Sequence, residues 1–110
     1  MNWSTLKTEQ EWDAILERSA TVPQLVYKHS TQCDISSMIK NRLAKKPLPE
    51  GIEFHYLDLI AYRSLSNKIA QVLGVRHESP QVLLIRDGKC IFHESHMAIR
   101  MDDIEAEAMS

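Results

Sequence analysis

The stretch that decides the fold is LVYKHSTQCDIS, residues 25–36, in which an apolar, strand-like run gives way to a helical pattern. Cys33 stands at the junction, where its sulfur would lie near the free N–H groups and the positive dipole end of a helix. Both favour the thiolate, which is the reactive form of cysteine. The position therefore predicts a redox-active thiol; the alternative is a small buried apolar side chain.

Three residues after Cys33, where a dithiol oxidoreductase has a second cysteine, this chain has Ser36. The Cys-x-x-Ser pattern indicates exchange through a mixed disulfide with a partner thiol, without an internal disulfide. Ser36 either hydrogen-bonds the thiolate or is a solvated helix residue, and the sequence leaves both open. The second cysteine of the chain, Cys90, falls in an expected hairpin strand, where a packed or half-exposed side chain is the commoner role.

The composition is that of an ordinary soluble globular protein, with 44% apolar and 25% charged residues in 110. We expect one domain over residues 1–110. A net charge of −2 gives no basic field for nucleic acid or anionic lipid, so we expect neither as a partner. No window approaches the roughly 18 consecutive apolar residues of a membrane span, and the start lacks a secretory signal pattern. With two cysteines in all, these features predict a cytoplasmic protein.

Apolar periodicity and turn signals predict a helix followed by the order β-α-β-α-β-β-α. A capping box formed by Thr8 and Glu11 opens the first helix, over about 9–19. Gly74 suits the left-handed residue that ends a helix, and Asp87-Gly88 is a two-residue hairpin turn. The other expected elements are strands over 24–28, 52–59, 82–85 and 90–92, and helices after Cys33 (capped by Ser30 or Thr31), over 64–73 and over 102–108.

This order of elements is that of an α/β thioredoxin-like fold, a mixed four-stranded sheet flanked by helices. In that arrangement the redox cysteine begins the helix after the first of these strands, which is where Cys33 stands. The fold class therefore supports the chemistry that the local pattern predicts.

Pro80 is the second residue expected at the site, because Ser79-Pro80 directly precedes the first hairpin strand. Thioredoxin-like folds have a cis-proline here, beside the cysteine, and the separation of 80 − 33 = 47 residues fits. A cis bond would expose the backbone N–H and C=O of Ser79 to a partner strand that carries the sulfur under attack. About 5% of X-Pro bonds are cis, so Ser79-Pro80 alone is weak evidence for a cis bond. The presence of Cys33 at this spacing strengthens the prediction.

A longer pattern extends over about residues 6–105. It consists of KHSTQCxIS (28–36), SNK (66–68), GVRHESPQ (74–81), DGK (87–89) and SH (95–96). Together these strings resemble the YtxJ-like family, which comprises the monothiol bacilliredoxins, small thioredoxin-like proteins linked to bacillithiol. The resemblance implies a thiol–disulfide oxidoreductase in which Cys33 takes bacillithiol from S-bacillithiolated proteins. Bacillithiol would be a co-substrate, with no bound cofactor, and a second low-molecular-weight thiol or a reductase would regenerate Cys33.

Asp34 departs from the family pattern, which usually has proline after the cysteine. A carboxylate in the first turn suits the helix dipole, but its charge opposes the neighbouring thiolate. We therefore expect Cys33 to be less acidic than with proline. Lys28, Arg76 and His77 would offset this if they lie on the same rim.

Thr31, Gln32, Arg76 and His77 complete the expected substrate-binding set with Ser36, Ser79 and Pro80. Thr31 and Gln32 would shape the entry through backbone groups, although Thr31 could serve as a cap alone. Arg76 and His77 favour an anionic ligand such as the carboxylates of a small thiol, or else have a structural or solvated role. The five histidines of the chain show no dense ligand spacing, so we expect no metal site.

Two other functions remain open on the sequence. A thioredoxin-like domain can keep its docking loop as a binding module without turnover, and Asp34 favours this most. A metal-cluster carrier like the monothiol glutaredoxins also uses Cys-x-x-Ser, but those proteins usually have Gly-Phe where this chain has Asp34-Ile35.

Overall fold

A computed structural model describes residues 3–110. It confirms the predicted order of helices and strands and adds a short strand before the first helix. The elements are β1 (Ser4–Thr5), α1 (Glu9–Arg18), β2 (Gln24–His29), α2 (Asp34–Ala44), β3 (Glu53–Asp58), α3 (Arg63–Leu73), β4 (Gln81–Arg86), β5 (Lys89–Ser95), a 3-10 turn η1 (His96–Ala98) and α4 (Met101–Met109).

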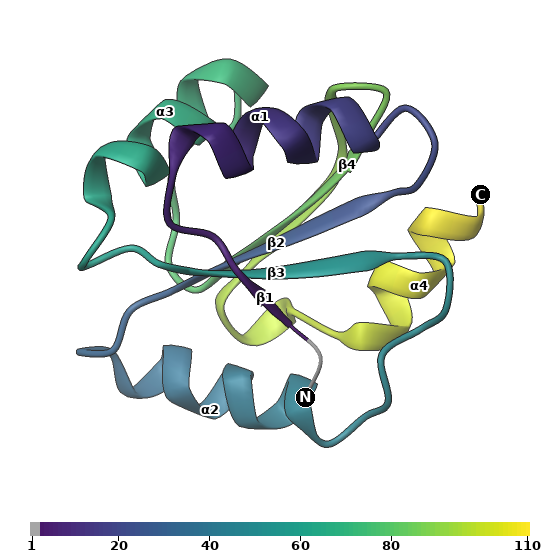
Figure 1. Cartoon of the computed structure of the whole chain (residues 1–110). Helices are drawn as coiled ribbons and strands as arrows, with labels where there is room; N and C mark the ends of the chain where they lie inside the picture. The colour runs from purple at the N-terminus through teal and green to yellow at the C-terminus, as the bar shows by residue number, and fades with distance from the viewer. Residues whose placement is uncertain (1–2) are drawn as a thin grey trace.

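The sheet has five strands in the order β1-β3-β2-β4-β5, so the expected count of four was wrong by one edge strand (Figure 1). β1, β3 and β2 are parallel, whereas β4 and β5 are antiparallel to β2 and to each other. The additional strand β1 pairs Ser4 and Thr5 with His55 and Tyr56. Both of its residues are exposed, and two polar residues show no alternation from which a strand could be predicted.

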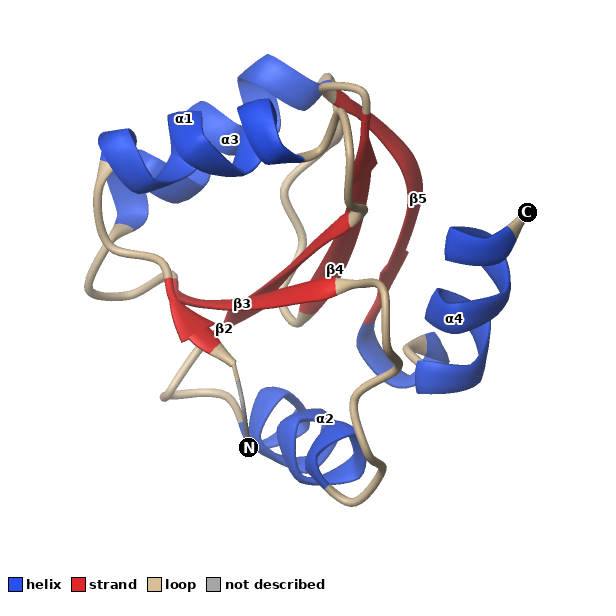
Figure 2. Cartoon of the chain, turned by 45° about the vertical axis from the view of Figure 1, so that its right-hand side comes forward, coloured by secondary structure: helices blue, strands red, loops and turns tan. Residues whose placement is uncertain are grey.

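Helices cover both faces of the sheet, with α1 and α3 on one side and α2 and α4 on the other (Figures 1 and 2). The alternation of side chains along β2 determines which core each residue enters. Leu25 and Tyr27 pack against α2 and α4, whereas Val26 packs against α1 and α3. No helix in residues 3–110 combines the length and apolar character needed to cross a membrane.

The predicted helix and turn signals are confirmed at three places. Thr8 accepts a hydrogen bond from the Glu11 N–H (3.1 Å), and the Glu11 carboxylate accepts one from the Thr8 N–H (3.0 Å). Gly74 ends α3 in the left-handed conformation, φ 67°. The turn between β4 and β5 has positive φ at both Asp87 (54°) and Gly88 (73°), as a type I′ hairpin requires.

The strand register brings three chain segments to one end of the sheet. Lys28, near the end of β2, pairs with Gln81 at the start of β4, and Gln81 pairs with Ser95 at the end of β5. The loop after β2, the loop before β4 and the turn after β5 therefore meet. Cys33 and Pro80 lie in the first two of these segments.

Candidate functional site

Cys33 is the N-cap residue of α2, with extended backbone angles (φ −118°, ψ 121°) and a half-exposed side chain. Its carbonyl accepts the Ser37 N–H at 3.1 Å, and its own N–H donates to the Ser30 carbonyl at 3.2 Å. The expected cap by Ser30 or Thr31 was wrong, because the cysteine itself is the cap residue. The Ser30 hydroxyl instead accepts the Gln32 N–H at 3.3 Å and shapes the loop.

The helix end lowers the pKa of the Cys33 thiol below its ordinary value, as predicted. The Ser36 N–H is the main cause, with the Ile35 N–H and the Ser36 hydroxyl adding to it. The thiol forms no cap hydrogen bond of good geometry, so these groups act by favouring the anion. Partial burial and the Asp34 carboxylate raise the pKa, and the net direction is still downward.

Ser36 is fully buried, so the solvated alternative was wrong. Its Oγ accepts the Ser30 N–H at 3.3 Å and lies 3.5 Å from the Ser79 Oγ. Its carbonyl accepts a hydrogen bond from the Tyr27 hydroxyl at 2.8 Å. Ser36 therefore joins the cysteine loop, the first turn of α2 and the loop before β4.

The Ser79–Pro80 peptide bond is cis, as predicted, and Pro80 is buried. The Pro80 carbonyl accepts the backbone N–H of His96, the first residue of η1, at 2.9 Å. Neither backbone group of Ser79 is hydrogen-bonded to another of residues 3–110. A free N–H and C=O beside the cysteine are what an incoming extended segment would need for pairing.

The other four expected substrate-binding residues make no hydrogen bond or ion pair with Cys33. Thr31 and Gln32 are exposed in the loop before α2, and Arg76 is exposed in the loop before β4. His77 is half-buried and turns inward, where its Nδ1 lies 3.3 Å from the Lys28 Nζ and 3.4 Å from the Ser66 Oγ. Its Nε2 is the ring nitrogen left for a ligand.

Two polar residues buried in β2, Tyr27 and Lys28, contribute to this end of the sheet. Lys28 was expected to offset the charge of Asp34 together with Arg76 and His77, but none of the three is among the groups that shift the pKa of Cys33. Tyr27 lies behind the first turn of α2, and its own pKa is raised, mainly by burial. Lys28 is fully buried on the other face, and its Nζ donates to the Ser66 carbonyl at 3.0 Å. A lysine directly after the apolar run Leu25-Val26-Tyr27 was the available signal.

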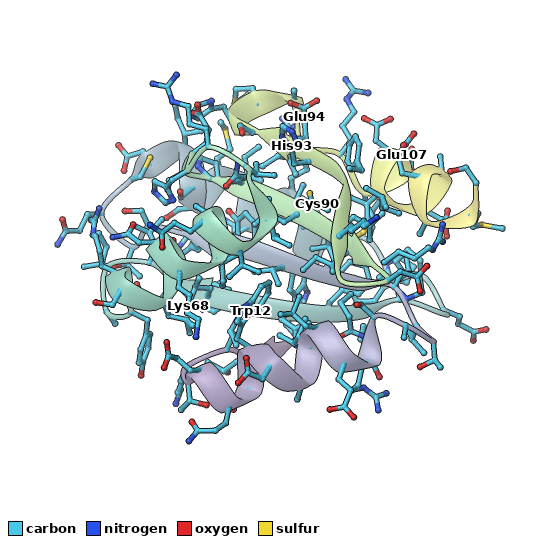
Figure 3. The ribbon with its side chains drawn as sticks, turned by 90° about the horizontal axis from the view of Figure 1, so that it is seen from above. Trp12, Lys68, Cys90, His93, Glu94 and Glu107 are labelled. Carbon is cyan, nitrogen blue, oxygen red and sulfur yellow. The ribbon has the colours of Figure 1, made fainter. Side chains whose placement is uncertain are left out.

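Cys90 lies at the other end of the sheet. It pairs with Ile85, which pairs with Gln24 at the start of β2, four residues or about 13 Å before Lys28. Its half-buried Sγ donates to the Phe92 carbonyl at 3.3 Å, and burial raises the pKa of its thiol. Figure 3 views the molecule from the α1 and α3 side and shows Cys90 on β5. This position is too far from Cys33 for a disulfide.

Metal-ligating side chains do not converge anywhere in residues 3–110: no three His, Cys, Asp or Glu side chains form a cluster suited to an ion. The site as described is thus a single acidic thiol at a helix end beside a cis-proline loop.

The solved structures that resemble this chain in fold include thiol redox proteins. One, described as a candidate oxidoreductase with a thioredoxin fold, is 26% identical and superposes with a TM-score of 0.82 over 97% of this chain and 93% of its own. Thioredoxin from Trypanosoma brucei brucei is 13% identical, with a TM-score of 0.75 over 96% of this chain and 87% of its own. Mitochondrial thioredoxin 3 from Saccharomyces cerevisiae is 14% identical, with a TM-score of 0.73 over 97% and 93%.

The family comparison agrees with these structural similarities. A sequence model of the monothiol bacilliredoxin BrxC matches residues 4–104, which is nearly the whole chain. Together with the lone acidic thiol, this match supports a thiol redox role. The chain belongs to the monothiol bacilliredoxin family and has the thioredoxin fold.

Proposed function

We propose that the protein removes bacillithiol from S-bacillithiolated proteins by a monothiol route in which Cys33 is the nucleophile. The observation that carries this proposal is a cysteine with a lowered pKa at the start of α2, with a serine three residues later and no second thiol in reach. The family match supports bacillithiol as the small thiol that is transferred.

The reaction is an exchange of one disulfide for another. The Cys33 thiolate attacks the bacillithiol sulfur of the mixed disulfide, the bond to the substrate protein breaks, and the substrate cysteine leaves as a thiolate that takes up a proton. Cys33 then holds bacillithiol in a new disulfide. A second thiolate, from free bacillithiol or a reductase, attacks the bacillithiol sulfur, forms a new disulfide with it and releases Cys33 as a thiolate.

Two features support this route over a dithiol route. Ser36 can hydrogen-bond the Cys33 sulfur but cannot displace bacillithiol from it. Cys90 lies at the far end of the sheet with a raised thiol pKa, so it is a poor attacking group at neutral pH. The mixed disulfide on Cys33 would therefore persist until an external thiol arrives.

The loop before β4 gives the substrate a place to dock. The backbone N–H and C=O of Ser79 have no hydrogen-bond partner among the described residues, and the Ser79 Oγ lies 3.5 Å from the buried Ser36 Oγ. An extended segment that pairs with Ser79 would bring its sulfur toward Cys33. Arg76, which is exposed in the same loop, and the His77 Nε2 could meet the carboxylates of bacillithiol.

Intact-protein mass spectrometry tests the proposal. The reduced chain is mixed with a bacillithiolated model protein and, in parallel, with a glutathionylated one, and Cys33→Ser and Cys90→Ser variants run beside the wild type. We expect Cys33 to gain the mass of bacillithiol, in the wild type and in Cys90→Ser but not in Cys33→Ser.

Each other outcome has a definite meaning. Equal transfer from both donors would leave the monothiol route standing and remove the preference for bacillithiol. Transfer by Cys33→Ser would overturn the assignment of the nucleophile. No transfer from either donor would favour a binding module, the role that the opposing charge of Asp34 favours.

A further inference from the structure

Lys28 is a buried cation that the exchange reaction, as proposed above, does not use. Its side chain is fully shielded from solvent, although it belongs to β2, the strand that leads into Cys33. No ion pair within residues 3–110 joins it to a carboxylate. An unpaired ammonium is costly to bury, and this burial lowers the pKa of Lys28 to about 8.

The Lys28 ammonium has two hydrogen-bond partners, and they lie on different elements. It donates to the Ser66 carbonyl on α3 at 3.0 Å and lies 3.3 Å from the His77 Nδ1. An ammonium has no lone pair, so the Nδ1 must be the acceptor and the His77 proton resides on Nε2. The Ser66 Oγ, 3.4 Å from the same Nδ1, is placed to donate as well.

The surroundings of His77 keep it in this accepting form. Burial is the main reason that the pKa of His77 is lowered, and the positive charges of Lys28 and Arg63 lower it further. Glu78 is the one group nearby that opposes them. A neutral ring retains the Nδ1 lone pair that Lys28 needs.

His77 belongs to the loop that ends in the cis Ser79–Pro80 bond. The buried Gln81 side chain binds the two residues that flank His77. It donates a hydrogen bond to the Arg76 carbonyl (3.0 Å) and accepts one from the Glu78 N–H (3.4 Å). Within residues 3–110, the hydrogen bond between Lys28 and His77 is the one side-chain hydrogen bond that joins this loop to β2, the strand that leads to Cys33.

We propose that Lys28 is a positioning residue for disulfide exchange: through its bond to the His77 Nδ1 it holds the Ser79–Pro80 loop in register with Cys33. The inference rests on the proposed function, because the register matters when a disulfide-bearing segment docks on Ser79. Lys28 is absent from the groups that shift the pKa of Cys33, so it acts on docking and leaves thiolate formation alone.

The test is a Lys28→Met variant, which keeps the length of the side chain and removes the donor. We expect transfer from the bacillithiolated protein to slow by about tenfold, since a buried charged donor and the orientation of the docking loop are both lost. Alkylation of Cys33 by iodoacetamide at the same pH should stay within about twofold of the wild type. Lys68→Met, a lysine on α3 paired with Glu9, is the matched control and should retain the transfer rate.

A double-mutant cycle separates positioning from a general loss of stability. If Lys28 acts through His77, adding Lys28→Met to His77→Ala should cost less than about twofold in transfer. Full additivity of the two effects would overturn the proposal, as would unchanged transfer by Lys28→Met alone or an equal loss of alkylation and transfer.

Nuclear magnetic resonance of the wild type provides a test that does not depend on transfer activity. Long-range proton–nitrogen spectra, with His77 assigned from the signals lost in His77→Ala, should show the Nε2–H tautomer at neutral pH. The Nδ1–H tautomer would overturn the proposal even if the proposed transfer is observed. The Nε2–H tautomer in a protein that transfers nothing would leave the Lys28–His77 bond standing and overturn the proposed function.

Discussion

The two cysteines of this chain lie at opposite ends of one sheet, and their surroundings move their acidities in opposite directions. Cys33 caps α2, where backbone N–H groups lower the pKa of its thiol, whereas Cys90 lies in a hairpin strand, where burial raises it. Both side chains are partly exposed, but burial is the main influence on the pKa of Cys90 alone. The helix end thus makes one thiol more acidic, while burial makes the other less acidic.

The largest expected difference between the two ends comes from removing each thiol in turn. Cys33→Ser should abolish disulfide transfer, a loss on the order of a thousandfold or more, because the nucleophile itself is gone. Cys90→Ser should change the rate by less than about twofold, since its side chain contacts only the hairpin and the neighbouring core. Stopped-flow or quenched mass spectrometry measures both rates, and comparable losses in the two variants would break the comparison.

Removing the Ser36 hydroxyl should lower both the transfer rate and the stability of the protein while leaving the nucleophile in place. In Ser36→Ala the pKa of Cys33 rises, because the hydroxyl that favours the thiolate is gone while the Ser36 N–H remains. We expect transfer at pH 7 to fall by about three- to tenfold. The free energy of unfolding should fall by about 1–3 kcal/mol, because the buried Ser30 N–H loses its acceptor.

The control for Ser36→Ala is Ser37→Ala, one residue further along the same helix, where the side chain is exposed. It should leave both the rate and the free energy of unfolding nearly unchanged. An equal effect of the two substitutions would show that helix α2 as a whole, and not the Ser36 hydroxyl, is responsible.

The buried amine of Lys28, on the strand that leads to Cys33, should make the free energy of unfolding depend on pH. The pKa of Lys28 is about 8 in the folded state, below the ordinary 10.5. Below pH 8 the Lys28 amine is protonated in both the folded and the unfolded protein, so the cost of burying it is constant. Between pH 8 and 10.5 the unfolded protein binds more protons than the folded one, so the free energy of unfolding rises with pH. The free energy of unfolding of the wild type minus that of Lys28→Met should rise by about 1–2 kcal/mol between pH 7 and 9.5.

Urea unfolding of both proteins across this range measures the difference, in which the titration of groups that do not interact with Lys28 cancels. Lys68→Met should show no such rise, because the pKa of Lys68 is raised by its pairing with Glu9 and lies above the window. A flat difference for Lys28→Met would mean that the amine stays charged and well solvated in the folded protein.

The smallest effect concerns Asp34, the residue that departs from the family pattern. Asp34→Asn removes a charge that raises the pKa of Cys33, so alkylation at pH 7 should speed up. We expect less than about a fivefold gain, since charges about 4 Å apart in water interact by about 1 kcal/mol. Asp103→Asn, in the first turn of α4, is the matched control and should have no effect on alkylation. A larger gain, of tenfold or more, would mean that Asp34 dominates the electrostatics of the thiol.

Local patterns were sufficient to predict most of the fold. The helices have strong periodicity and identifiable ends, as in the capping box of Thr8 and Glu11 and the left-handed Gly74, and the Asp87-Gly88 turn defines the hairpin. The edge strand β1 was missed because two exposed polar residues form a strand only through their pairing with β3. Such a strand forms only through its tertiary contacts, so the local sequence shows no strand pattern.

The site was predictable where one residue's chemistry depends on its own element, as for Cys33 at a helix start and Pro80 before a strand. It was not predictable where partners are far apart in sequence, as for Lys28 and His77, which are 49 residues apart. The burial of Ser36 likewise depends on the loop around Ser79, which the helical pattern of α2 does not contain. These contacts arise from the register of β2 with β4.

The most direct test of the contrast between the two thiols is to titrate both in one sample. The wild type is alkylated briefly with iodoacetamide from pH 5 to 10, and peptide mass spectrometry follows Cys33 and Cys90 separately. We expect Cys33 to be labelled with a midpoint below the ordinary thiol pKa and Cys90 with a midpoint above it. Two coincident curves, or a midpoint for Cys33 above that of Cys90, would contradict the claim that the start of α2 makes Cys33 the reactive thiol.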